Sequence, residues 1–219
     1  MDKQNMGSSP IDNSEQTCFW EGSFGDDYTE RNQINSETRL GFFRRVLSRT
    51  FGVSTICELG ANKGHNLQAL HKLSRNFRLS GIEINKKACA DLAGLPYVHA
   101  SNASIQTFAA DEPFDMVFVC GVLIHLNPDD LPLAYRKMFD LSRRYVLINE
   151  YFNPSPVELP YRGNGGKLFK RDFGGEFMDS CGKEATLVDY GFLWKRLEPA
   201  WDNTTWWLFE KSDPTGKER

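Results

Sequence analysis

The stretch Ser54-Thr-Ile-Cys-Glu-Leu-Gly-Ala-Asn-Lys-Gly64 decides the fold of this 219-residue chain. Its first half is a short β-prone run, and leucines at helical spacing begin directly after Gly64. Glycine lets the backbone turn sharply and approach a ligand closely, and the start of a helix offers free N–H groups. The stretch therefore predicts a strand, a ligand-binding turn and a helix, the first unit of a doubly wound α/β fold.

Strand and helix patterns alternate from this point onward. We expect further strands at 77–84, 97–100, 114–120 and 144–149, and helices at 65–74, 86–93 and 128–141, with an earlier helix starting near residue 32. Alternation with short connections predicts a mainly parallel, seven-stranded, Rossmann-like sheet covered on both faces. Two strand-like runs at 185–190 and 204–210 predict an antiparallel C-terminal edge.

The composition narrows the classes of protein to consider. Lys and Arg number 26 against 29 Asp and Glu, and this net charge of -3 argues against nucleic acid as the main partner. The sequence lacks an apolar run long enough to span a membrane, and its first 15 residues lack the apolar centre of a signal peptide. Five cysteines without CxxC spacing predict free thiols and no metal site. We expect a cytoplasmic protein.

The glycine turn differs from a phosphate-binding loop. Such loops read G-x-G-x-x-G, whereas this one has Gly60 and Gly64 with Glu58 two positions earlier. An acidic side chain repels a pyrophosphate but suits a ligand with an ammonium or sulfonium charge. Glu83 ends the next strand, where this fold places a carboxylate that binds a ribose diol. Alone, E-x-G-x-x-x-G can be an ordinary turn; joined to Glu83, it predicts a ligand with a ribose and a positive charge.

Three successive stretches resemble the signatures of class I S-adenosylmethionine methyltransferases: Ile56-Cys-Glu-Leu-Gly-Ala-Asn-Lys-Gly64, Gly81-Ile-Glu-Ile84 and Phe114-Asp-Met-Val-Phe-Val-Cys-Gly-Val-Leu-Ile-His-Leu126. Residues 19–32, 150–157, 160–163, 167–173 and 189–192 are similar to the pseudaminic acid biosynthesis-associated methylases. The resemblance implies a methyltransferase whose cofactor is S-adenosyl-L-methionine.

The resemblance also implies which residues contact this cofactor. Gly60, Ala61 and Gly64 would approach its methionine part. Asn102 stands where many members have an Asp that faces the adenine amine, and Asn62 replaces a frequent glycine but tolerates positive φ. The full predicted cofactor set is Glu58, Gly60, Ala61, Asn62, Gly64, Glu83, Ile84, Asn102, Ala103 and Cys120.

Two catalytic candidates lie near the expected acceptor site. His125 follows the fourth strand and could act as a general base, or it could pack over the cofactor. Tyr28, Arg31 and Asn32 precede the core, where this architecture often carries a lid; Tyr28 is the second catalytic candidate, and all three are predicted to bind substrate. A plain surface turn is the alternative for this segment.

A basic cluster follows the fifth strand. Arg162, Lys167, Lys170 and Arg171 lie within ten residues, at the carboxyl edge of the sheet where such folds bind ligands. Arginine can hold a carboxylate or phosphate through two hydrogen bonds. Together with Tyr151, these side chains are predicted to bind an anionic acceptor; a solvated basic loop is the alternative.

The resulting prediction is one domain with one activity. Residues 17–211 form the methyltransferase domain, with an N-terminal lid and helix at 17–50 and an acceptor-binding insertion at 153–183, while 1–16 and 212–219 are polar tails, the first disordered. The expected reaction is O-methylation of a small anionic metabolite such as a nonulosonic acid, on a hydroxyl or on a phosphonate or carboxylate oxygen.

Several alternatives to this function remain open. An RNA or protein methyltransferase is the first, and a dinucleotide-dependent oxidoreductase and a catalytically inactive binding module are the others. We expect no nucleic-acid or membrane partner, and a monomer or homodimer.

Overall fold

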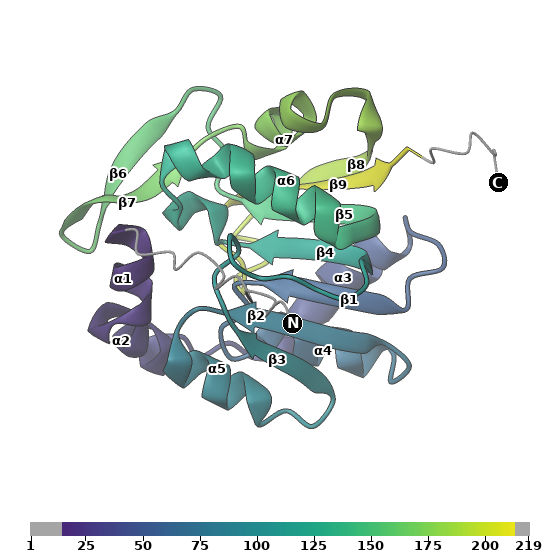
Figure 1. The fold of residues 1–219 in the computed structure, drawn as a ribbon, viewed down its shortest axis with the longest axis horizontal. Helices are drawn as coiled ribbons and strands as arrows, with labels where there is room; N and C mark the ends of the chain where they lie inside the picture. The colour runs from purple at the N-terminus through teal and green to yellow at the C-terminus, as the bar shows by residue number, and fades with distance from the viewer. Residues whose placement is uncertain (1–14, 213–219) are drawn as a thin grey trace, which may run out of the picture.

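In the computed structural model, which describes residues 15–212, the predicted glycine turn follows an inner strand of a seven-stranded sheet (Figure 1). In spatial order the strands are β3 (Val98–Asn102), β2 (Arg78–Glu83), β1 (Thr55–Leu59), β4 (Phe114–Cys120), β5 (Ser142–Glu150), β9 (Thr204–Lys211) and β8 (Ala185–Leu193). The first five are parallel, and β9 runs antiparallel to both of its neighbours. The predicted Rossmann-like sheet with an antiparallel C-terminal edge is confirmed.

Helices cover both faces of this sheet (Figure 1). One face carries α3 (Leu40–Leu47), α4 (His65–Leu73) and α5 (Lys86–Ala93), and the other carries α6 (Leu131–Leu141) and α7 (Phe173–Cys181). The strands supply apolar side chains to both layers: Phe118 packs with the α3 side, and Val117 with the α6 side. Side chains of a strand alternate between its faces, so a strand buried on both sides is apolar throughout.

Two helices start later than predicted. The expected helix near residue 32 begins at Leu40, after a 3-10 turn over Ser36–Arg39. The Asn35 side chain accepts the N–H of Glu37 and starts that turn. The helix expected at 128–141 opens with a 3-10 turn, Pro128–Asp130, in which the Asn127 side chain accepts the N–H of Asp129.

The N-terminal segment forms a helix pair, α1 (Glu15–Glu21) and α2 (Ser23–Arg31), at the carboxyl ends of the strands (Figure 1). Glu15 and Gln16, expected in the disordered tail, belong to α1 because Gln16 is buried and donates a hydrogen bond to the Gly166 carbonyl. The rest of that predicted tail, residues 1–14, and the C-terminal residues 213–219 lie outside the described residues.

The insertion after β5 contains a separate hairpin, β6 (Val157–Tyr161) and β7 (Asn164–Lys170), beside α1 (Figure 1). Its two central loop residues both have positive φ, 49° at Arg162 and 85° at Gly163. Positive φ at both positions matches the right-handed twist of the strands, but it costs a non-glycine residue roughly 1–2 kcal/mol. The fold therefore holds Arg162 in an unfavourable backbone conformation at the hairpin tip.

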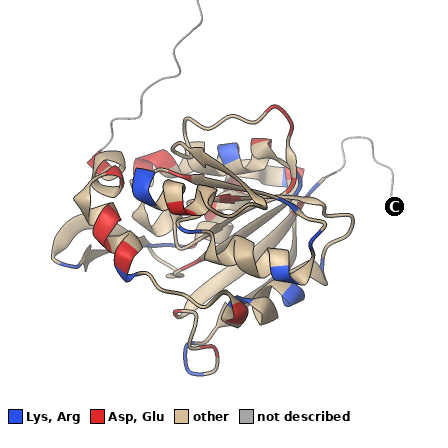
Figure 2. Cartoon of the chain, turned by 90° about the horizontal axis from the view of Figure 1, so that it is seen from below, with Lys and Arg blue, Asp and Glu red and all other residues tan. Residues whose placement is uncertain are grey.

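Charged side chains are spread over the whole molecule (Figure 2). Basic and acidic residues intermingle on the helices and loops. None of the helices within residues 15–212 is long and apolar enough to cross a membrane. The same residues contain no group of three or more His, Cys, Asp or Glu side chains that could hold a metal ion.

Candidate functional site

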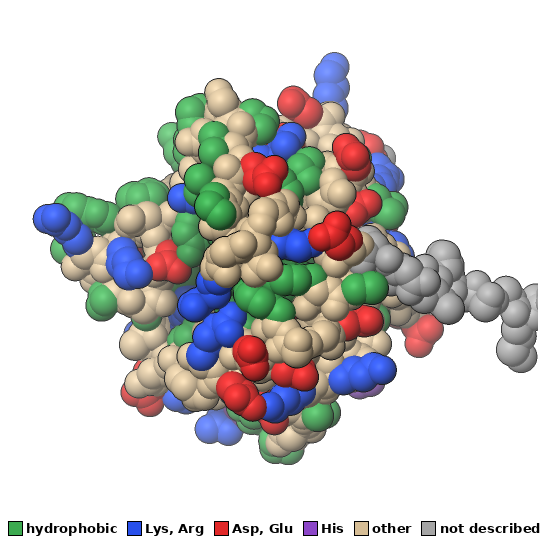
Figure 3. Space-filling view, turned by 90° about the vertical axis from the view of Figure 1, so that its left-hand side faces the viewer, with side chains coloured by type: hydrophobic (Ala, Val, Ile, Leu, Met, Phe, Trp, Pro, Cys, Tyr) green, Lys and Arg blue, Asp and Glu red, His purple; other side chains and the backbone are tan. Residues whose placement is uncertain are grey.

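A cavity of about 590 Å³ opens at the carboxyl ends of β1, β2, β4 and β5, between the sheet, the α1–α2 pair and the β6–β7 hairpin. This volume is within the usual range for a small-molecule site. Figure 3 faces the side with α1, α2 and the hairpin, where hydrophobic and charged side chains lie side by side. The predicted site residues that line the cavity are Tyr28, Asn32, Glu58, Gly60, Ala61, Asn62, Glu83, Ile84, Ala103, Cys120, His125, Tyr151 and Arg162.

The glycine turn and Glu83 form one hydrogen-bonded unit. Gly60 has φ 74°, and a Cβ there would lie 2.6 Å from a methyl group of Val122, so this position requires glycine. Asn62 has φ 48°, and its N–H donates to Glu83 Oε2 at 2.7 Å. The other carboxylate oxygen accepts the N–H of Asn85 at 2.8 Å. Glu83 therefore ties the first turn to the second, and burial raises its pKa.

Two side chains that can carry opposite charges lie on the cavity wall without an ion-pair partner among residues 15–212. Glu58 is 2% exposed; its Oε1 accepts a hydrogen bond from Asn66 at 2.6 Å, while its Oε2 has no partner among residues 15–212. Burial raises the pKa of Glu58 to about 8. Arg39 is 7% exposed, stacks over the Trp201 ring at 3.5 Å and forms no ion pair with another described residue. Glu58 would ionise when a cation pairs with it, so the two side chains fit a ligand that carries one group of each sign.

Gly64 and Asn102, predicted to contact the cofactor, do not line the cavity. A Cβ on Gly64 would lie 2.6 Å from Leu92 and 2.9 Å from Leu95, so this glycine serves the packing of α4 against α5. The Asn102 side chain donates to the backbone carbonyls of Glu83 and Ile84 at 2.8 and 2.9 Å. The wall after β3 is formed instead by residues 103–106.

His125 ends a 3-10 turn, η2 (Leu123–His125), that a buried carboxylate holds in place. Glu150 Oε1 accepts the N–H groups of Val122 and Leu123 at 2.7 and 2.8 Å. His125 Nδ1 lies 2.7 Å from the carbonyl of Lys167 and donates to it, so Nε2 is the nitrogen left without a proton. Burial lowers the pKa of His125 to about 4. The imidazole is therefore neutral at neutral pH, with a free lone pair at the cavity wall.

Aromatic side chains from the lid and the hairpin meet over His125. The Trp20 ring centre lies 4.5 Å from that of His125, 5.4 Å from Tyr28 and 6.3 Å from Tyr161. Burial raises the pKa of Tyr28 to about 12, which keeps its hydroxyl protonated. Tyr28 can thus donate a hydrogen bond into the cavity but is a poor candidate for a base, and its catalytic role stays a prediction.

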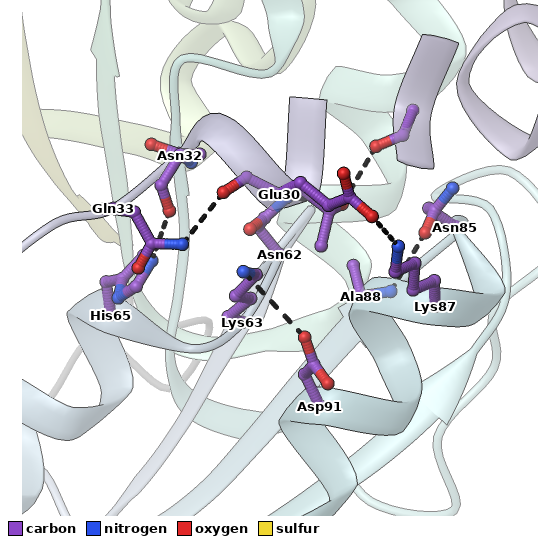
Figure 4. Close-up of polar contacts among 12 residues, drawn as sticks. Glu30, Asn32, Gln33, Asn62, Lys63, His65, Asn85, Lys87, Ala88 and Asp91 are labelled. Atoms are coloured by element: carbon purple, nitrogen blue, oxygen red, sulfur yellow. Dashed lines mark hydrogen bonds and ion pairs between the residues drawn. The ribbon is translucent and has the colours of Figure 1, made fainter. Parts of the chain in front are cut away.

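Polar contacts fix α2 onto the two turns that line the cavity (Figure 4). The Asn85 side chain, which also caps α5, donates to the Trp20 carbonyl at 3.2 Å and to Asp26 at 2.9 Å. Glu30 pairs with Lys87, and the Asn32 carbonyl lies 3.2 Å from His65 Nε2. The helix pair therefore covers the site, as a lid would; its movement remains a prediction.

Four of the basic residues predicted to bind substrate lie off the cavity wall. Lys167 is buried and pairs with Glu15 at 2.7 Å, and Arg171 pairs with Glu176 at 2.7 Å. Lys170 stacks on the Tyr151 ring at 5.2 Å, and Arg31 on the Phe24 and Tyr28 rings at 5.1 and 5.5 Å. Arg162, by contrast, lines the mouth and makes no side-chain hydrogen bond or ion pair within residues 15–212. Of the four basic residues in the predicted anion site, Arg162 is the one that lines the cavity.

The wall and supporting residues that escaped the sequence analysis include Trp20, Arg39, Glu150, Trp201 and Asp202. Arg39 carried one usable signal, because it shares the helical spacing of the buried Phe42, Phe43 and Val46 and so had to be buried with them. Asp202 accepts a hydrogen bond from the Tyr151 hydroxyl. The two residues are 51 positions apart, so no local sequence pattern predicts this contact.

The fold is similar to those of solved methyltransferases. The 1,6-didemethyltoxoflavin-N1-methyltransferase of Burkholderia thailandensis, solved with its substrate and S-adenosylhomocysteine, gives a TM-score of 0.66 at 12% identity over 90% of this chain and 87% of its own. Magnesium protoporphyrin IX methyltransferase from Synechocystis PCC 6803, solved with S-adenosylmethionine, gives 0.63 at 12% identity over 93% and 100%. Coclaurine N-methyltransferase gives 0.63 at 12% identity over 90% and 81%. No family model and no curated protein sequence matches the chain. The likeness establishes the Rossmann-like methyltransferase fold.

Proposed function

We propose that this protein is an S-adenosylmethionine-dependent methyltransferase that methylates an oxygen of a small anionic acceptor. The observation that carries the proposal is the pair of buried ionisable side chains Glu58 and Arg39, beside the Gly60 turn, neither of which forms an ion pair with a described residue. An amino-acid end group has one ammonium and one carboxylate, and it would satisfy both. The cavity is large enough for a nucleoside-linked amino acid.

The buried polar atoms without partners support the fit of this cofactor. Besides Glu58 Oε2 and Arg39 Nε, they include Asn62 Oδ1, Asn66 Oδ1 and Trp201 Nε1, all on the same cavity wall. Buried polar atoms are normally hydrogen-bonded, so a cluster of unsatisfied ones indicates a bound polar group. Glu83 would accept the ribose hydroxyls, and residues 103–106 would border the adenine.

In the proposed reaction, S-adenosylmethionine supplies a methyl group on a sulfonium. The chain's own residues place the acceptor and handle its proton. His125 Nε2 accepts a hydroxyl proton, and Glu150 keeps the His125 turn in position through the N–H groups of Val122 and Leu123. Trp20, Tyr28 and Tyr161 exclude water around the acceptor.

Arg162 is the residue proposed to bind the acceptor's anionic group. It is the cation at the cavity mouth, and the hairpin keeps it there despite a positive φ. A hydroxy acid, including a sugar acid of the nonulosonic type, would place its anion at Arg162 and its hydroxyl at His125. A phosphonate or carboxylate oxygen would need no base, so the neutral imidazole favours a hydroxyl.

Calorimetric titration tests the cofactor. S-adenosylhomocysteine should bind, and NAD should not, because the turn lacks the G-x-G-x-x-G pattern that binds a pyrophosphate. Glu58→Gln should weaken the binding of S-adenosylhomocysteine by about 1.5–3 kcal/mol, since it removes a charge-assisted contact. Glu37→Gln, on the exposed surface, is the matched control. Equal affinity for NAD, or no effect of Glu58→Gln, would refute the proposed cofactor.

A further inference from the structure

The outer strand of the sheet carries a row of exposed aromatic side chains. Tyr190 is 62% exposed and Phe192 55%, both on β8, and Trp194 directly after the strand is 46% exposed. Their Cα partners on β9 show that Tyr190 and Phe192 lie on the face that also carries α7. Large apolar side chains in such a row usually mark an interaction surface.

β8 also has free backbone groups. It pairs with β9 on one side and has no strand neighbour on the other within residues 15–212. The register with β9 shifts between Leu187 and Asp189, and beyond this bulge the strand is regular up to Leu193. An exposed regular edge is a template for another strand.

The chain's own ends are poor candidates to cover this edge. The residues after Ser212 read Asp-Pro-Thr-Gly-Lys-Glu-Arg, a sequence without a large apolar side chain to pack on aromatic rings. The described chain starts at Glu15, beside the hairpin, and Figure 1 shows α1 and β8 on opposite sides of the molecule. The exposed edge and its aromatic row match a second molecule that carries a similar apolar row.

We propose that two copies of this chain pair through β8, antiparallel and about a two-fold axis at Gly191. This register uses the regular segment beyond the bulge. It sets Tyr190 of each copy opposite Phe192 of the other, and Val188 opposite Trp194. Cross-strand pairs of aromatic and β-branched side chains stabilise a sheet. The proposal is independent of the proposed enzymatic function.

The charge of Asp189 favours this register over one with the two-fold axis at Asp189. A two-fold axis at Asp189 would set that carboxylate against its own copy, and like charges directly opposite each other destabilise a sheet. With the axis at Gly191, Asp189 faces Leu193, and residues 188–194 contain no other charged side chain. The segment is thus complementary to itself in this register, as a symmetric interface requires.

The inference also bears on the site. The segment between β8 and β9 contributes Pro199, Ala200, Trp201 and Asp202 to the cavity wall. Trp201 stacks on Arg39, and Asp202 binds the Tyr151 hydroxyl and Lys195. A partner held on β8 would therefore restrain the segment that completes the wall.

Sedimentation equilibrium on the full chain tests the pairing. The wild type should be dimeric, and Tyr190→Lys and Phe192→Glu should each raise the dimer dissociation constant at least about 30-fold, as loss of a central aromatic anchor does. Leu133→Lys, on an equally exposed leucine of α6, is the control and should leave the dimer intact.

Mixing the two variants tests the register. Residue 190 of one copy faces residue 192 of the other, so the mixture should form a heterodimer with one Lys–Glu pair and regain much of the lost affinity. A monomeric wild type would overturn the proposal, and so would a dimer that neither substitution weakens or a mixture without recovery. A variant truncated after Ser212 is a further comparison. If this variant is dimeric while the full chain is monomeric, the C-terminal residues cover the edge and the proposal fails for the full chain.

Discussion

Replacing His125 by Asn tests the assignment of the base and the environment that the structure gives it. The Asn amide nitrogen can occupy the place of imidazole Nδ1 and keep the hydrogen bond to the Lys167 carbonyl, now 2.7 Å long. What the variant lacks is the free lone pair of Nε2 and the titrating proton. Any change should therefore reflect chemistry more than loss of the turn.

The magnitude follows from the burial of the imidazole. Its pKa falls from an ordinary 6.5 to about 4 in the folded chain, so protonation favours the unfolded state. The contribution of neutral His125 to the free energy of unfolding is fully present above pH 6.5. It is lost as the pH falls from 6.5 to about 4. Between about pH 7.5 and about pH 4.5 the wild type should lose roughly 2.5 kcal/mol more than His125→Asn.

Two assays measure these effects. Urea unfolding at several pH values gives the difference in stability between the two proteins. Turnover of an acceptor alcohol gives the chemistry: kcat of His125→Asn should fall by about 10²–10⁴, with unchanged affinity for S-adenosylhomocysteine. In the wild type, the acid limb of kcat/KM should lie near pH 4, the pKa in the free protein.

An acid limb near the ordinary histidine pKa, together with equal pH dependence of stability in both proteins, would refute the buried neutral imidazole. Full turnover by His125→Asn would refute the base while leaving the burial argument intact. The two outcomes are therefore separable.

Four further results are expected. Glu83→Gln should weaken the binding of S-adenosylhomocysteine by about 1.5–3 kcal/mol in calorimetry, because it removes a charged acceptor from the turn; unchanged affinity would rule out the ribose contact. Arg162→Gln should raise KM for an anionic acceptor much more than for its neutral analogue, whereas Lys170→Gln should change both little, because Lys170 does not line the cavity; equal losses would remove the case for an anionic substrate. Proteolysis within residues 18–35 should slow when S-adenosylhomocysteine and acceptor are both present, and protection independent of ligands would mean that α1–α2 is not a lid. Gly174→Ala should destabilise the fold by about 1–3 kcal/mol in urea, since its Cβ would lie 2.5 Å from the Trp207 ring, while Gly41→Ala, with open space around it, should be neutral or stabilising.

The sheet could be predicted from the sequence because its signals are local. The Gly60 turn, the apolar run 114–120 and the helix spacing after residue 64 each fit within a few residues. The β6–β7 hairpin escaped because Arg162 takes the positive-φ position where Asn, Asp or Gly is the usual signal. The α1–α2 pair was not predicted because its helices are short and are stabilised by contacts with Asn85 and Gly166, far along the chain.

The charges of the site were the least predictable feature. Arg162, Lys167, Lys170 and Arg171 form a cluster in the sequence, but Glu15 and Glu176 neutralise two of them in space. Arg39 lies in no cluster and is nevertheless the buried unpaired cation, because Trp201 packs on it from 162 positions away. The ion pairs that form in the folded chain determine which charged side chains remain able to bind a ligand. These pairs cannot be predicted from the amino-acid composition.

The hairpin and the α1–α2 pair have a consequence for how such a protein can change over time. The proposed cofactor wall is built from turns at the ends of β1, β2 and β4, whose residues are locked into the sheet. The opposite wall comes from two appended segments that hold each other through Gln16 and Lys167. Mutations can remodel these segments with little disturbance of the sheet, so a new acceptor specificity could evolve while the proposed methyl-donor site and the sheet stay the same.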